Sequence, residues 1–144
     1  MAKGYPDFFG MPIFPSYGAV NQLDSGAVDI PMGTTVAIIN LVGKFRIQGG
    51  GITCTCPAGL RLDRIRCTVD GTAYPWIAFE YMQEQWGWED HQMLKVVYDD
   101  ANNQRLTMVF DPDWSIRDSL YVEYESNGGG DAVAQIMLYY NLII

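Results

Sequence analysis

The sequence predicts an all-β protein: a jelly-roll β-sandwich of about eight strands with an extended N-terminal arm. Three observations favour this class. Apolar and polar residues alternate over many short stretches, which is the period of a half-buried strand. Turn residues separate these stretches about every 8 to 12 residues, a spacing typical of sandwiches and barrels. No stretch carries a convincing helical stripe.

The composition indicates one globular domain. The chain has 144 residues, of which 49% are hydrophobic, enough for a core without disulfides. We divide it into an arm (1–24) and a sandwich domain (25–144). The longest apolar runs are shorter than the ~20 residues of a membrane-spanning helix. The N-terminus lacks the apolar core of a secretory signal, so we expect a protein made and kept in a reducing cytoplasm.

The predicted arm is rich in glycine, proline and aromatic residues. Three prolines within ten residues, Pro6, Pro12 and Pro15, exclude a helix. Disordered tails are usually polar, whereas this segment is strongly apolar and must lie on something. It either packs over its own domain or reaches a neighbouring subunit. We favour a neighbour, bound through the aromatic side chains Tyr5, Phe8, Phe9, Phe14 and Tyr17.

The sandwich begins with three candidate strands. Residues 27–30 form a short one that ends at Pro31. Residues 34–42 are nearly continuously apolar, which predicts a strand covered on both faces. Residues 45–48 alternate as a one-sided strand, and Gly49–Gly51 form a flexible break.

The stretch from Ile52 to Gly71 is the predicted centre of the domain. Its alternation slips by one residue between Leu62 and Ile65. We attribute the slip to a bulge, or to a crossing from one sheet to the other at Asp63-Arg64. Asp70-Gly71 predicts a tight turn.

Five further strands complete the pattern. Residues 76–82 alternate, residues 94–98 and 106–110 form a hairpin, and residues 120–125 alternate again. Residues 132–144 form a terminal strand that is apolar on both faces. Val133, Met137 and Tyr139 share one face, and the other face holds Ala134, Ile136, Leu138, Tyr140 and Leu142. Because one small domain covers only one face easily, this strand predicts an oligomer.

Several residues could carry chemistry, and each has a plainer interpretation. His91, beside Glu89 and Asp90, could be the base of a small hydrolase, but we expect a solvated loop residue and no enzyme. Asp111, Asp113 and Asp118 could gather around calcium, but we expect turn and capping roles. Cys54, Cys56 and Cys67 lack a fourth metal ligand at a familiar spacing, and we expect small buried hydrophobic residues. We expect no cofactor.

The exposed tryptophans offer a second function. Trp86 and Trp88 flank Gly87 in a polar loop and could stack on sugar rings, as in carbohydrate-binding sandwiches. Interface anchoring is the commoner use of such residues. Direct nucleic-acid binding is disfavoured, because the net charge is −8 and the few basic residues form no cluster.

The whole chain resembles a group of viral proteins. It opens with Met-Ala-Lys-Gly-Tyr-Pro-Asp-Phe-Phe-Gly, continues with Cys-Pro-Ala-Gly-Leu-Arg-Leu-Asp-Arg-Ile-Arg-Cys-Thr-Val-Asp-Gly, and ends in an apolar strand. In this it is similar to the small β-sandwich virion proteins of tailed bacteriophages that decorate capsids or form head fibres. The resemblance implies a homotrimer on a capsid lattice, in contact with the major capsid protein or another virion protein, without catalysis. Dimers are the commonest soluble oligomers, but a trimer suits three-fold lattice positions.

Overall fold

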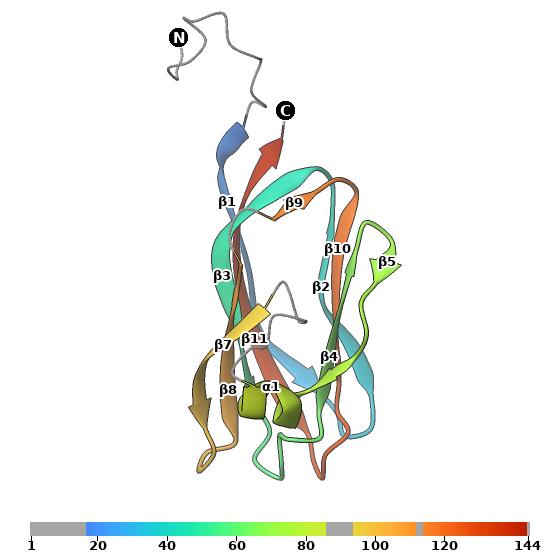
Figure 1. Cartoon of the computed structure of the whole chain (residues 1–144), viewed down its shortest axis with the longest axis vertical. Coiled ribbons are helices and arrows are strands. Elements are labelled where there is room, and N and C mark those ends of the chain that lie inside the picture. Colours follow the sequence, from blue (N-terminus) through green and yellow to red (C-terminus); the bar gives the residue numbers. More distant parts are fainter. Residues whose placement is uncertain (1–16, 86–93, 112–113, 144) are drawn as a thin grey trace, which may run out of the picture.

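Two antiparallel sheets stack face to face in the computed structural model of the chain, which describes residues 17–85, 94–111 and 114–143 (Figure 1). Sheet A has the strand order β1-β11-β3-β8-β7, with β9 paired to β3. Sheet B has the order β2-β10-β4-β5, with β6 paired to β4. The predicted all-β sandwich is therefore confirmed. No helix in the described part of the chain is long and apolar enough to span a membrane.

The elements have these bounds: β1 Tyr17–Ile30, β2 Thr35–Val42, β3 Phe45–Thr55, β4 Arg64–Val69, β5 Thr72–Ala73, β6 Ile77–Ala78, α1 Phe79–Gln85, β7 Leu94–Asp100, β8 Arg105–Phe110, β9 Ser115–Ile116, β10 Ser119–Glu125 and β11 Ala132–Ile143.

Alternating side chains from both sheets fill the core. Ile52 and Ile136 from sheet A and Val122 from sheet B have no exposed surface. Burying each such side chain stabilises the fold by about 1.5 to 3 kcal/mol. Phe79 and Tyr124 meet edge to face at the lower end, with their ring centroids 5.3 Å apart. The core therefore joins the two layers along their whole length.

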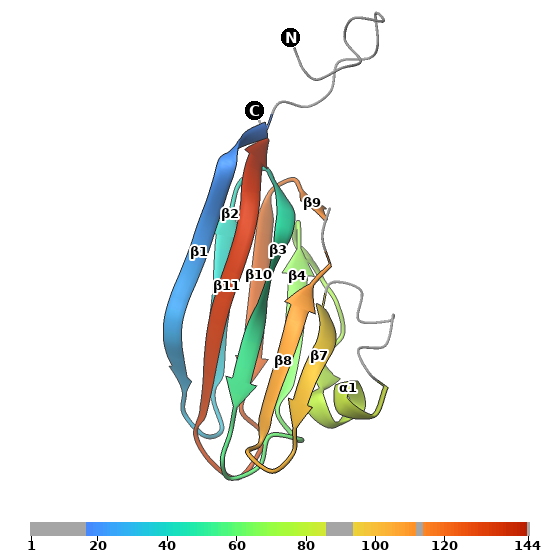
Figure 2. The same cartoon turned by 90° about the vertical axis from the view of Figure 1, so that its left-hand side faces the viewer.

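The terminal strand β11 lies in the middle of sheet A, between β1 and β3 (Figure 2). Its predicted faces are correct as far as Tyr139 and wrong at Leu142, which is 46% exposed, because the register with β3 shifts between Tyr139 and Tyr140 and reverses the alternation. Ala134, Ile136 and Leu138 are buried, whereas Val133 and Tyr139 are each 38% exposed. Among the described residues nothing covers this second face, and the apolar residues there remain at the surface.

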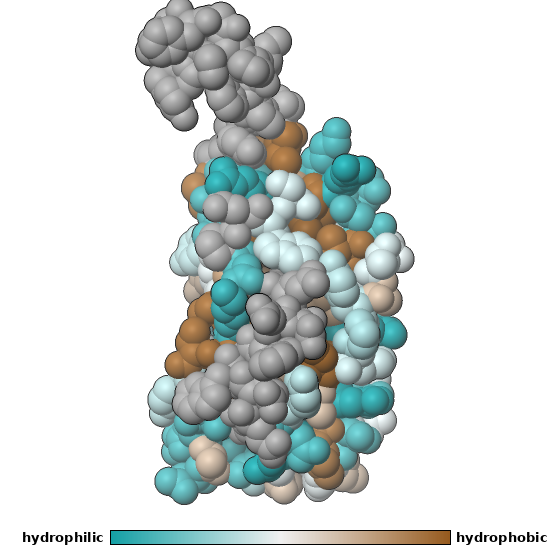
Figure 3. All heavy atoms as spheres, in the orientation of Figure 1, coloured by the Kyte–Doolittle hydropathy of each residue, from teal (hydrophilic) through white to brown (hydrophobic). Residues whose placement is uncertain are grey.

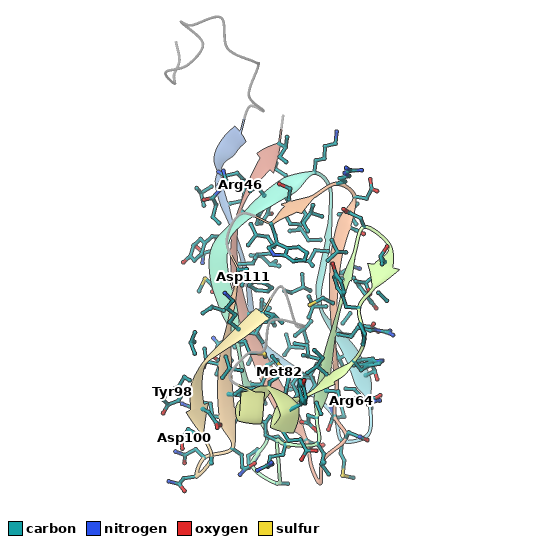
Figure 4. All side chains as sticks on the ribbon, viewed as in Figure 1. Arg46, Arg64, Met82, Tyr98, Asp100 and Asp111 are labelled. Atoms are coloured by element: carbon teal, nitrogen blue, oxygen red, sulfur yellow. The ribbon has the colours of Figure 1, made fainter. Side chains whose placement is uncertain are left out.

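The region 76–82 was predicted as a strand, and this is wrong beyond Ala78. Only Ile77–Ala78 pair with β4, and Phe79–Gln85 form α1. Phe79 and Met82 are both buried, which is the three-residue spacing of one helix face. Met82 projects from α1 into the space between the sheets (Figure 4). The alternating apolar residues concealed this helical spacing.

The start of β1 and the exposure of β2 also differ from expectation. Residues 17–24, assigned to the arm, form the first half of β1. The strand β2 is not covered on both faces, since Ala37, Asn40 and Val42 are exposed. It is an edge strand of sheet B, so its outer face meets solvent despite its apolar sequence.

The three glycines predicted as a break lie inside β3. Gly50, with φ at +110°, pairs with Leu138, and the register with β11 shifts just beyond Gly49, between Tyr139 and Tyr140. A Cβ on Gly50 would overlap the carbonyl oxygen of Met137, and a Cβ on Gly51 would overlap that of Met108. The glycines therefore let neighbouring backbones approach closely, and they leave a strip of sheet A without side chains.

We expect Gly51→Ala to destabilise the protein by about 1 to 3 kcal/mol, because the new methyl group overlaps a sheet carbonyl. Gly49→Ala is the matched control, since a Cβ there meets nothing within 4 Å, and it should change stability by less than about 0.5 kcal/mol. Urea denaturation of both variants measures the difference. Equal stabilities would contradict this account of the glycine strip.

Candidate functional site

Asp63 is a carboxylate buried where the chain crosses from β3 in sheet A to β4 in sheet B. Its side chain has no exposed surface. The hydroxyl of Tyr124 donates to Oδ2 at 2.5 Å, and the backbone N–H groups of Asn127 and Gly128 each donate to Oδ1 at 2.8 Å. The backbone carbonyl of Asp63 also accepts the N–H of Phe79, at 2.9 Å. One residue thus ties together β4, β10, the loop after β10 and the start of α1.

Two cysteine thiols, Cys54 and Cys56, lie near this carboxylate. Burial raises the pKa of both, and the negative charge of Asp63 raises it further. Burial alone raises the pKa of Cys67 to about 12. Thiolates, not thiols, are the nucleophiles, so these three cysteines are inert. The prediction that they are small buried residues is confirmed.

Tyr124 is likewise held in its neutral form. Burial raises the pKa of its hydroxyl, and the nearby Cys54 and Asp63 add to the rise. A neutral hydroxyl donates to the Asp63 carboxylate, as the geometry requires. Because these groups have no exposed surface, the arrangement holds the fold together and offers nothing to a substrate.

Asp70 makes a second carboxylate clamp at the opposite end of β4. Its Oδ1 accepts the backbone N–H groups of Arg117, Asp118 and Ser119 at 2.9, 2.7 and 3.2 Å. Asp70 and Gly71 both have positive φ angles in the predicted tight turn, which connects β4 to β5. Desolvation acts to raise the pKa of Asp70, but the three N–H donors and Arg117 together lower it below its ordinary value.

Only some of the predicted site residues lie within the described part of the chain. Tyr5, Phe8, Phe9, Phe14, Trp86, Trp88, His91 and Asp113 lie outside the described residues and remain predictions; for Tyr17 only the backbone is described, at the start of β1. The carboxylate of Asp111 lies 3.1 Å from the Lys95 ammonium, and Asp118 is exposed beside the Asp70 clamp. Within the described ranges no group of three His, Cys, Asp or Glu residues could hold a metal ion.

The arginines of β4 are occupied by partners on the outer face of sheet B. Arg64 and Arg66 stand opposite Glu125 and Glu123 in the register, with N–O distances of 2.5 and 2.6 Å. Their guanidinium groups lie 5.3 and 4.5 Å from the centre of the Trp76 ring. These contacts pair both arginines of β4 with carboxylates and cover them with an aromatic ring.

Four exposed apolar side chains lie on β1, β2 and β11 toward the end of the sandwich where β1 begins and β11 ends. This terminal apolar surface consists of Val20, Val42, Tyr139 and Leu142, which are 59%, 77%, 38% and 46% exposed. The N–H of Ile143 donates to the carbonyl of Lys44 at 3.0 Å, which holds the end of β11 beside the β2–β3 turn. Hydrophobic residues are visible there in Figure 3. Such clusters are characteristic of interaction sites.

We expect Asp63→Ala to cost about 3 to 5 kcal/mol, because it leaves buried donors without an acceptor. Tyr124→Phe should cost about 1.5 to 3 kcal/mol through the lost charge-assisted hydrogen bond. Tyr121→Phe, on the outer face of the same strand, is the control and should be nearly neutral. Urea denaturation measures all three. A loss below about 1 kcal/mol for Asp63→Ala would contradict its central role.

The lowered pKa of Asp70 predicts acid sensitivity. A carboxylate with a lowered folded-state pKa stabilises the protein above its unfolded-state pKa of about 3.9, and this stability is lost as the pH falls. Asp70→Asn keeps an oxygen acceptor but cannot titrate. The stability difference between the parent and this variant should therefore shrink as the pH is lowered from 6 to about 2.5. A difference that is constant over this range would contradict the clamp, and Asp29→Asn on the exposed face of β1 is the control.

Comparison with known proteins adds no functional assignment: no protein-family model and no curated protein matches the chain. Its function has to be argued from the geometry of its own residues.

Proposed function

We propose that this protein is a structural virion component, of the kind that decorates a capsid or belongs to its head, and that it assembles as a homotrimer. It would be made in the host cytoplasm and would work without catalysis or a cofactor. The observation that carries the proposal is the terminal apolar surface, which lies at the end of the sandwich where the N-terminal segment enters β1 (Figure 1).

The strand order supports the finer fold that such a protein would have. Successive strands β1, β2, β3 and β4 alternate between the two sheets, and β10 and β11 return to lie between earlier strands. This gives β1-β11-β3-β8 facing β2-β10-β4. Two nested Greek keys of this kind define a jelly roll, and we assign the sandwich to that fold.

The size of the surface supports a role for the arm. A stable interface buries roughly 800 Å² on each partner, which four side chains do not supply. The 16 residues before β1 include Phe8, Phe9 and Phe14, and when extended they reach at most about 55 Å. That length suffices to cross to a neighbouring subunit, so the arm and the terminal apolar surface together can form the contact.

Light scattering during size-exclusion chromatography tests the assembly. The full chain should elute at three times its mass of 16.2 kDa. Deleting residues 1–16, which leaves β1 intact, should weaken or abolish the trimer. A full chain that is monomeric at about 10 µM, far above a typical specific dissociation constant, would contradict the proposal.

Point variants test whether the terminal apolar surface, and not any exposed apolar residue, holds the trimer together. Val42→Glu with Leu142→Glu should dissociate the trimer, because each places a charge in an apolar contact. Met32→Glu with Leu62→Glu is the matched control, since both are exposed apolar residues outside the terminal apolar surface. The control should leave the mass unchanged.

Capsid attachment needs its own measurement. Cosedimentation with capsids assembled from the capsid protein encoded beside its gene should recover the full chain. If neither the full chain nor the chain lacking residues 1–16 cosediments with capsids, the decoration role is contradicted even if the protein is an oligomer.

A further inference from the structure

The outer face of sheet A carries a shallow groove of about 310 Å³. Figure 2 shows this sheet facing the viewer. Gly51 forms the floor of the groove, because it has no side chain. In the sheet register Gly51 is flanked by Met137 on β11 and Val109 on β8. The glycine strip therefore opens an apolar depression, one side chain deep, on a face without cover among the described residues.

A polar row runs beside this apolar row. Gln135, Thr53 and Thr107 are partners in the register of β11, β3 and β8, and all three line the groove. The two threonine hydroxyls lie 3.0 Å apart, and Gln135 is exposed. These groups both donate and accept hydrogen bonds.

A carboxylate closes one end of the groove. Asp24 on β1 stands opposite Met137 and lines the groove. Its Oδ1 accepts the N–H of Gly26 at 2.9 Å. Its second oxygen has no hydrogen bond from the described residues and is available to a ligand as an acceptor.

Charge selects against an anion. Asp24 is the one charged residue that lines the groove. Lys95, the register partner of Val109, is paired with Asp111 at 3.1 Å. The chain as a whole has a net charge of −8. A phosphate, sulfate or acidic sugar would meet a carboxylate without a compensating cation, so the groove does not suit an anionic ligand.

We propose that this groove binds a neutral saccharide of one or two rings. A sugar ring has an apolar C–H face and a hydroxyl edge, and the groove has an apolar row beside a polar row. The C–H face would lie over Gly51 between Met137 and Val109. The hydroxyls would meet Gln135, the two threonines and Asp24. The volume lies at the small end of ligand sites.

The rival occupant is an aromatic side chain of the arm. A phenylalanine ring would cover the apolar row but would leave the polar row and Asp24 without partners. The saccharide uses both rows, and we favour it for that reason. The inference does not depend on the proposed trimer, because the groove lies within one subunit.

Nuclear magnetic resonance titration of the full chain with maltose, cellobiose and lactose tests the proposal. At least one of these probes should shift the amide signals of β3, β8 and β11 saturably. Thr107→Val and Gln135→Ala should each weaken binding about tenfold, the effect of roughly 1.4 kcal/mol. Thr68→Val, the same change on sheet B, is the control and should leave the dissociation constant unchanged.

Three results would overturn the proposal. The first is an absence of binding by all three sugars, on the full chain and on the chain lacking residues 1–16. The second is binding that Thr107→Val and Gln135→Ala leave unchanged. The third is binding that Trp86→Ala alone abolishes, which would place the sugar at the predicted tryptophan pair. Shifts of the groove amides on deletion of the arm, without sugar binding, would identify the arm as the occupant.

Discussion

The buried carboxylate of Asp63 is the constraint on which the joining of the two sheets depends. A buried charge is tolerated only when hydrogen bonds replace its lost water. Here the donors come from β10 and from the loop after it. The crossing from β3 to β4 can therefore close only when the chain from Tyr124 to Gly128 is in place. Gly128 packs so tightly that a Cβ would overlap the carbonyl oxygen of Gly59. The position of the Asp63 carboxylate, the path of the crossing and the glycine loop after β10 therefore depend on one another.

Ionisable groups are treated differently in the core and at the surface of the molecule. Every group with a perturbed acidity in the core, namely the thiols and the Tyr124 hydroxyl, is held neutral by burial. On the outside, the basic residues of β4 are matched by glutamates and covered by Trp76. Among the described residues, the terminal apolar surface and the groove above Gly51, with its Asp24 carboxylate, lie open to solvent.

The sequence pattern predicted the features that depend on neighbouring residues, namely strand faces, a hairpin and a tight turn. The alternation of 132–144 predicted its two faces as far as Tyr139, but not the register shift that exposes Leu142. The 94–98 and 106–110 segments pair as predicted, and Asp70-Gly71 forms its turn. The slip near Asp63 correctly indicated a crossing between sheets, but not the buried carboxylate, whose partners lie more than 60 residues away. The helix α1 was missed because its apolar residues also fit a period of two. The groove was missed because the register of three strands creates it, and the glycines alone suggested a break.

The position of β11 determines when the molecule can form. This strand lies between β1 and β3 in sheet A, so β1 has no neighbour in its own sheet until β11 has been synthesised. Long-range pairing of this kind is slow. During translation β1 therefore stays unpaired in its sheet while all the strands between it and β11 are made. Sheet A cannot be completed before β11 is available.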